Sequence, residues 1–125
     1  MNPGAYSGLV LAYIGDAVFE LMARTMALSE ADTQPGKLHK RTKALVTARA
    51  QSRMYHKLLP SLTPDEAAAM RRGRNACSYT PKSATPTEYR HATGVESLFG
   101  YVYLSGGHQR ARELFEICLR EEDDI

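Results

Sequence analysis

The chain has 125 residues, a formal net charge of +2, and 43% hydrophobic and 24% charged residues, a composition typical of a globular domain. No apolar run approaches the roughly 20 residues that span a bilayer, and the start, MNPGAYSG, lacks the basic region of a secretion signal. Cys77 and Cys118 have no metal-ligand spacing, so we expect two reduced thiols in a cytoplasmic protein with no membrane partner.

The charge is divided unevenly along the chain. Residues 1–36 have a net charge of −3, and residues 91–125 have a net charge of −4. Between them, residues 37–90 carry twelve Lys and Arg against three acids, a net charge of +9. A basic middle segment indicates a polyanionic partner, although the solvated face of a helix gives the same pattern.

The N-terminal half predicts two or three helices. Apolar residues at helical spacing predict a first helix over about 6–27, and Pro35-Gly36 marks a turn after it. Residues 37–59 form a basic amphipathic pattern that is either one helix or two, ended by Pro60. Its predicted inward residues are Leu38, Leu45, Ala48, Met54, Leu58 and Leu59.

Two similar helix starts organise the C-terminal half. Residues 63–66 and 85–88 each supply an N-cap Thr, a Pro at the first helical position and a Glu three residues after the cap. The first predicts a short helix to about Arg72, and the second a long apolar helix to about Leu104. We expect a loop over 71–84 and a last helix from Gln109 to Glu121. No segment alternates with period two, so the predicted fold class is all-α.

Two of these helices carry an acid and a glycine inside an apolar run. LAYIGDAVFEL, residues 11–21, contains Gly15 and Asp16, and TGVESLFGYVYL, residues 93–104, contains Glu96 and Gly100. A glycine costs a helix about 1 kcal/mol relative to alanine, and a buried carboxylate costs more unless it has a partner. If the glycines let the two helices approach closely, Asp16 and Glu96 would face one hard cation, for which carboxylate oxygens are preferred ligands.

Other chemistry has weaker support in the sequence. Glu20 lies four residues before Arg24, a spacing typical of a solvated ion pair. The four histidines lack H-E-x-x-H spacing, and the chain has no nucleophile elbow, dinucleotide-binding motif or Walker loop. His91 falls on a different face of its helix from Glu96, so we interpret it as a structural residue or an RNA contact.

The basic residues predict a surface for a nucleic-acid duplex. They cluster on the second predicted helix and in the predicted loop, with few exposed aromatic residues among them, which favours phosphate contacts over base stacking. The candidate RNA-binding residues are Lys40, Lys43, Arg71, Arg72, Arg74, Lys82 and Arg90.

Several of these segments resemble one known family. LAYIGDAVFEL resembles the signature helix of the ribonuclease III superfamily, and ATGVESLFGYVYLSGG resembles its second acidic helix. Together with KALVTARAQ, RRGRNACSYTPK and TEYRHATG, they resemble Mini-ribonuclease III, the short bacterial branch that lacks a double-stranded-RNA-binding domain. The resemblance covers essentially the whole chain, with the segments in the same order.

This resemblance implies an all-helical homodimer with a single catalytic domain over residues 1–125. It implies cleavage of double-stranded RNA with Mg²⁺ to give 5′-phosphate and 3′-hydroxyl ends, in the maturation of large-subunit (23S) ribosomal RNA precursors. Asp16 and Glu96 match the metal-binding, catalytic acids of the family. Two further acids of full-length ribonuclease III are replaced by Ala12 and Thr93, as in the short branch, so we expect one Mg²⁺ with mostly water ligands.

The resemblance also implies an interface and leaves two alternatives open. An exposed apolar stripe on the first helix, with Leu9, Tyr13 and Tyr6, is the expected dimer surface, and a ribosomal protein is a further candidate partner. Because two acids are replaced, the chain could instead bind structured RNA without cleaving it. A purely structural helical dimer is the second alternative.

Overall fold

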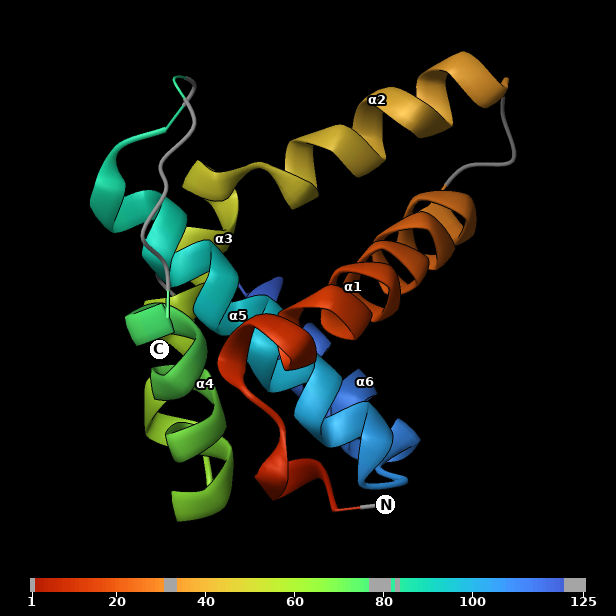
Figure 1. Ribbon diagram of the computed structural model, residues 1–125. Helices are drawn as coiled ribbons and strands as arrows, with labels where there is room; N and C mark the ends of the chain where they lie inside the picture. The colour runs from red at the N-terminus through yellow and green to blue at the C-terminus, as the bar shows by residue number, and fades with distance from the viewer. Residues whose placement is uncertain (1, 31–33, 77–81, 83, 121–125) are drawn as a thin grey trace.

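The computed structural model describes residues 2–30, 34–76, 82 and 84–120, and every regular element in these residues is a helix (Figure 1). This confirms the predicted all-α class. No helix in these ranges is both long and apolar enough to cross a membrane. The elements in chain order are η1 (Pro3–Ala5), α1 (Gly8–Glu30), α2 (Pro35–Val46), α3 (Ala48–Leu58), η2 (Leu59–Ser61), α4 (Pro64–Ala76), α5 (Pro86–Leu104) and α6 (His108–Cys118).

Helix α5 runs through the middle of the molecule, with α1, α3, α4 and α6 packed around it (Figure 1). Between Ala92 and Val102, all its residues are buried except Glu96 and Tyr101. Phe99 of α5, Phe19 of α1 and Phe115 of α6 meet edge to face, with ring centroids 5.3 to 6.4 Å apart. Such aromatic contacts stabilise a core beyond their buried area. The apolar run therefore forms a helix covered on several sides.

Both predicted helix starts are present as reciprocal caps. The Thr85 hydroxyl accepts a hydrogen bond from the Glu88 backbone N–H at 3.1 Å, and the Glu88 carboxylate accepts one from the Thr85 N–H at 3.2 Å. Thr63 and Glu66 repeat the arrangement at 3.2 and 2.9 Å. Each cap satisfies backbone N–H groups that the first turn leaves without partners.

Glu66 also connects three elements through Arg110 of α6. The guanidinium donates to both carboxylate oxygens of Glu66 at 2.9 Å and to the Ser61 carbonyl of η2 at 2.7 Å. These hydrogen bonds lower the pKa of Glu66 below its usual value, with the Arg110 contact as the largest cause. The ion pair therefore joins α4, η2 and α6 at the edge of the core.

The basic segment of residues 37–59 contains two helices. Thr47 separates them in an extended conformation, with φ −68° and ψ 153°, and its hydroxyl accepts a hydrogen bond from the Ala50 N–H at 3.1 Å. The same residue thus ends α2 and caps α3. Met54 and Leu58 are buried as expected, but Leu59 is 46% exposed, because it begins η2 and leaves the inward face of α3.

The prediction of a loop over residues 71–84 is wrong at its start, because α4 continues to Ala76. Gly73, which interrupts the sequence pattern, is buried against α5: a methyl group there would overlap the side chain of Ser97. Packing therefore keeps a poor helix former inside the helix. The last helix begins at His108 and ends at Cys118; the predicted end, Glu121, lies outside the described residues.

Helices α1 and α5 are in backbone contact where they cross. A methyl group on Gly15 would overlap the Glu96 carbonyl oxygen, and a methyl group on Gly100 would overlap the Leu11 carbonyl oxygen. The two glycines thus let the helices approach until one backbone touches the other, as the sequence predicts.

Gly15→Ala should destabilise the protein by at least about 2 kcal/mol, because the two helices must separate to admit the methyl group. The matched control is Gly36→Ala in α2, where the described residues place no atom within 4 Å of the added methyl group, apart from the chain neighbours and helix backbone of Gly36 itself. It should be neutral or stabilising by up to about 1 kcal/mol. Urea unfolding followed by circular dichroism measures both, and equal stability of the two variants would contradict the close contact.

Candidate functional site

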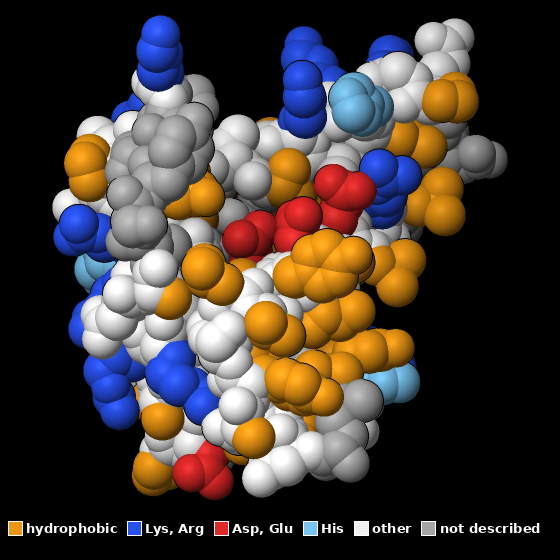
Figure 2. Space-filling model, viewed as in Figure 1, with side chains coloured by type: hydrophobic (Ala, Val, Ile, Leu, Met, Phe, Trp, Pro, Cys, Tyr) orange, Lys and Arg blue, Asp and Glu red, His pale blue; other side chains and the backbone are white. Residues whose placement is uncertain are grey.

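The crossing of α1 and α5 brings Asp16 and Glu96 together. Asp16 follows the glycine that touches the Glu96 backbone, so the helix contact places the two side chains at the same point. They share a surface hollow of about 580 Å³ with a third acid, Glu20. Its remaining lining residues are Leu9, Ala12, Tyr13, Ile14, Ala17, Tyr89 and Thr93. Figure 2 shows acidic side chains side by side near the middle of one face, with hydrophobic side chains below them and basic ones above.

The surroundings of Glu96, including Asp16, strongly affect its ionisation. Asp16 is exposed, whereas Glu96 is half-buried. Burial, the negative charge of Asp16 and a hydrogen bond between the two side chains raise the pKa of Glu96 to about 8. Within the described residues, no Lys or Arg forms an ion pair with either carboxylate. At neutral pH the pair therefore retains a proton, and a cation would stabilise its fully ionised form.

The donor set of the hollow is small for a metal site. The described residues contain no group of three or more His, Cys, Asp or Glu side chains that could hold a metal ion. Ala12 is buried and offers no ligand atom, and the Thr93 hydroxyl donates to the Tyr89 carbonyl at 3.0 Å. Two carboxylates fit Mg²⁺, which usually keeps several water molecules and binds through one or two carboxylates.

The predicted pair of Glu20 and Arg24 is confirmed, with an N–O distance of 2.8 Å and both side chains substantially exposed. Glu20 nevertheless lines the hollow, which its sequence interpretation as a solvated residue did not include. Tyr89 is a second lining residue that the sequence analysis did not identify. It lies four residues before Thr93 and seven before Glu96, so helical spacing alone places it on the same side of α5.

The candidate RNA-binding residues are spread over four segments. Lys40 and Lys43 are exposed on α2, Arg90 is exposed on α5, and Lys82 is exposed between α4 and α5. The three arginines predicted in a loop instead occupy the last turns of α4, because that helix continues to Ala76.

The three α4 arginines differ in their partners. Arg71 is exposed, whereas Arg72 donates to the Gly4 carbonyl and Arg74 donates to the Tyr55 hydroxyl at 3.1 Å. Two of the three therefore have structural contacts in addition to any role toward RNA.

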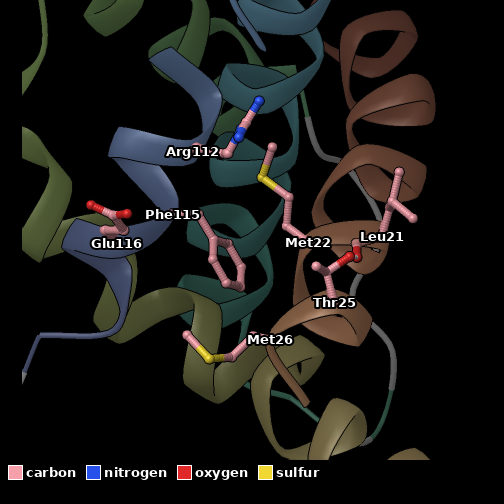
Figure 3. A pocket seen from close by; sticks show the side chains of 7 residues that line it. All are labelled: Leu21, Met22, Thr25, Met26, Arg112, Phe115 and Glu116. Atoms are coloured by element: carbon pink, nitrogen blue, oxygen red, sulfur yellow. Dashed lines mark hydrogen bonds between the residues drawn. The ribbon is translucent and has the colours of Figure 1, made fainter. Parts of the chain in front are cut away.

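A second hollow, between α1 and α6, has a different character. Figure 3 shows Met22, Met26 and Phe115 between the two helices, whereas Glu116 points away from them. The hollow measures about 410 Å³ and is also lined by Leu21, Thr25 and Arg112. It lacks the pair of acids found at the crossing of α1 and α5, so we place the candidate site at that crossing.

Comparison with known proteins shows the family of the chain. Residues 9–107, which include both acids, match the model of the Ribonuclease III domain. A Mini-ribonuclease 3 from Symbiobacterium thermophilum is 41% identical over 116 residues, 92% of this chain and 89% of that protein. A Mini-ribonuclease 3 from Enterococcus faecalis is 41% identical over 118 residues, 92% of this chain and 89% of that protein.

The fold has a counterpart among solved structures. The crystal structure of a protein from Fusobacterium nucleatum matches with a TM-score of 0.85 and 32% identity, and the match covers 94% of this chain and 96% of that one. The sequence matches and the helical fold lead to one conclusion: the chain belongs to the ribonuclease III domain family of endoribonucleases.

Proposed function

We propose that the chain is a Mg²⁺-dependent endoribonuclease that cleaves double-stranded RNA. The observation that carries the proposal is the pair of Asp16 and Glu96, which share one hollow and form no ion pair with a basic side chain of the described residues. Membership of the ribonuclease III domain family supports the same reaction. Two carboxyl groups that line one surface hollow are suited, once ionised, to a hard divalent cation.

Asp16 and Glu96 are the residues that would hold Mg²⁺. When bound, the ion supplies a water of lowered pKa and stabilises negative charge on the phosphate under attack. Asp16 offers an exposed carboxylate, and Glu96 must give up its proton before it can act as a ligand. The side chains of Ala12 and Thr93, which also line the hollow, are uncharged and add no carboxylate ligand. The proposed products carry 5′-phosphate and 3′-hydroxyl ends.

The proposed RNA surface uses cations outside the hollow. Lys40, Lys43, Arg71, Lys82 and Arg90 are exposed, and all lie in the segment with a net charge of +9. Contacts of this kind neutralise phosphates whatever the base sequence, which suits recognition of a duplex by its shape. We include Arg72 and Arg74 in this surface, with their contacts to Gly4 and Tyr55 holding them in place.

The proposed active form is a homodimer. Tyr13 is 84% exposed and Leu9 53% exposed, although both belong to an apolar helix and border the acidic hollow. Tyr6 and Val10 extend this exposed apolar surface, being 37% and 49% exposed. An isologous interface that pairs this stripe with itself would hold two active sites in fixed relation, one for each strand of the duplex.

The proposed substrate is a precursor of 23S ribosomal RNA, on the strength of the resemblance to Mini-ribonuclease III over essentially the whole chain. In this proposal residues 1–125 act as one catalytic domain in the cytoplasm, and a ribosomal protein bound to the precursor is a further partner to test.

Asp16→Asn and Glu96→Gln should each reduce cleavage of an RNA duplex in Mg²⁺ by about 100-fold or more, because each removes a charged ligand. The control is Glu116→Gln, which changes an exposed acid on α6 and should cleave normally. Gel analysis of both strands measures the rate. Cleavage by either site variant at close to the normal rate would contradict the proposal, and binding without cleavage by the unchanged chain would favour an RNA-binding protein instead.

The stability of the metal-free protein should fall as the pH rises from about 4.5 to about 8. In this range the unfolded chain releases the Glu96 proton at its usual pKa of 4.5, whereas the folded chain keeps it up to a pKa of about 8. Glu96→Gln cannot lose this proton, so at pH 8 in EDTA it should be more stable than the unchanged chain by about 1–3 kcal/mol.

Thermal unfolding measures this difference, which should disappear below pH 4.5, where Glu96 is protonated in both states. Added Mg²⁺ should raise the unfolding temperature of the unchanged chain more than that of Glu96→Gln. An equal Mg²⁺ effect on the two proteins would remove Glu96 from the proposed metal site.

Tyr13→Asp should give a monomer or an aggregate without cleavage activity, because two like charges would meet across the two-fold axis at a cost of several kcal/mol. Leu28→Asp is the control, since Leu28 is 58% exposed near the other end of the same helix. Size-exclusion chromatography with light scattering determines the mass. An active dimer of Tyr13→Asp would show that the interface lies elsewhere.

A further inference from the structure

Three groups that can carry positive charge meet at the contact of α3, α4 and α5, outside the acidic hollow. The ring of His91 stacks on that of Tyr55, with centroids 4.2 Å apart and an angle of 13°. The ring of His56 stands nearly perpendicular to both, at 4.9 Å from His91 and 5.6 Å from Tyr55. Arg74 reaches the same tyrosine by donating from Nη1 to its hydroxyl at 3.1 Å. We call His56, Arg74 and His91 the α3–α5 cationic cluster.

The polar atoms around this cluster hold it in place without neutralising it. Ser52 Oγ lies 2.9 Å from His91 Nδ1, which fixes the ring, and among the described residues no hydrogen bond is formed by His91 Nε2. Arg74 Nε donates to the side-chain oxygen of Asn75 at 3.2 Å. Tyr55 is buried, and the stacked ring of His91 covers it, whereas His56 is exposed. The donors therefore lie on a rigid base at the surface.

No acid of the described residues forms an ion pair with the cluster. The acids that form ion pairs among the described residues are Glu20, Glu66 and Glu113, and their partners are Arg24 and Arg110. Glu88, three residues before His91 on α5, accepts a hydrogen bond from the Thr85 backbone in its capping box. Burial lowers the pKa of His91, and the nearby His56 and Arg74 lower it further. A proton on His91 would place a positive charge beside Arg74, and a bound anion would stabilise that charge.

The surroundings extend the positive charge along α3. Arg49 and Arg53 are exposed and fall, with Ser52 and His56, at spacings of three and four residues, which place them on one face of the helix. A row of cations at helical spacing suits successive phosphates of a nucleic-acid backbone better than a single small anion.

We propose that the α3–α5 cationic cluster binds a backbone phosphate of the RNA duplex, away from the bond that is cut. This inference rests on the proposed function, because it takes the RNA duplex as the ligand. His91 precedes Glu96 by five residues, about 7.5 Å along the axis of α5 and on another face of the helix. The cluster thus binds RNA beside the cleavage site and contributes part of the affinity of the chain for the duplex.

The test measures RNA binding apart from cleavage. We expect an Asp16→Asn chain to bind a short RNA duplex without cutting it, and fluorescence anisotropy measures the dissociation constant. Adding His56→Gln and His91→Gln together should weaken binding by about tenfold, the effect of losing hydrogen bonds to a charged group. Circular dichroism and thermal unfolding show whether the variant is folded. The single His56→Gln change, at an exposed residue, gives a second reading of the same contact and should weaken binding measurably.

The chain offers a matched control in His108 of α6. Its ring also stacks on a tyrosine, Tyr103, with centroids 5.0 Å apart and an angle of 5°, but it belongs to a different part of the molecule. His108→Gln in the Asp16→Asn chain should leave binding unchanged. Unchanged binding by the folded double variant, or an equal loss in His108→Gln, would overturn the inference.

Histidine NMR signals separate the sources of phosphate. Adding the duplex to the Asp16→Asn chain should shift the ring signals of His56 and His91 and leave those of His108 in place. A shift with inorganic phosphate but none with the duplex would make the cluster a site for free phosphate and overturn the RNA contact. A separate cleavage assay of the chain with Asp16 restored tests the proposed function. Normal cleavage, with no shift of the His56 and His91 signals, would overturn this inference alone. Shifted signals without cleavage would overturn the enzyme proposal alone.

Discussion

The backbone contact between α1 and α5 is the constraint on which the rest of the structure depends. Because Gly15 lies against the Glu96 carbonyl, Asp16, the next residue, lies beside the side chain of Glu96. One turn further along α1, Phe19 meets Phe99 in the core. The same crossing therefore builds the acidic hollow on one side and the aromatic centre on the other. A change that separates the helices would disturb both, although Phe115 of α6 also supports the aromatic centre.

This arrangement places two acids where the fold gains nothing from them. Burial and the charge of Asp16 hold Glu96 in its protonated form well above its usual range. Elsewhere the chain pairs its acids efficiently, as Glu66 with Arg110 and Glu20 with Arg24 show. An unfavourable carboxyl pair of this kind is a local exception expected at a functional site.

The sequence predicted those features that depend on neighbours along the chain. The glycine-and-acid pattern located the crossing, and the two Thr-Pro starts located α4 and α5. The sequence did not predict features that depend on contacts between helices far apart in the chain. The predicted loop over residues 71–84 includes Gly73, yet the fit of Gly73 against Ser97 keeps it inside α4. The α3–α5 cationic cluster comes from three helices with no common spacing, so no motif could have assembled it.

The pKa values of two glutamates are shifted in opposite directions, and together they influence the pH at which the fold is most stable. Glu66 has a lowered pKa, so its contribution to stability is lost in acid, as the pH falls below its usual 4.5. Glu96 has a raised pKa, so it lowers the stability of the fold as the pH rises through neutral to about 8. As far as these two groups determine it, the stability of the metal-free protein is highest in mildly acidic solution. A divalent cation that pairs with ionised Glu96 would extend that optimum toward alkaline pH, so the metal content of the surroundings would set the pH tolerance of the protein.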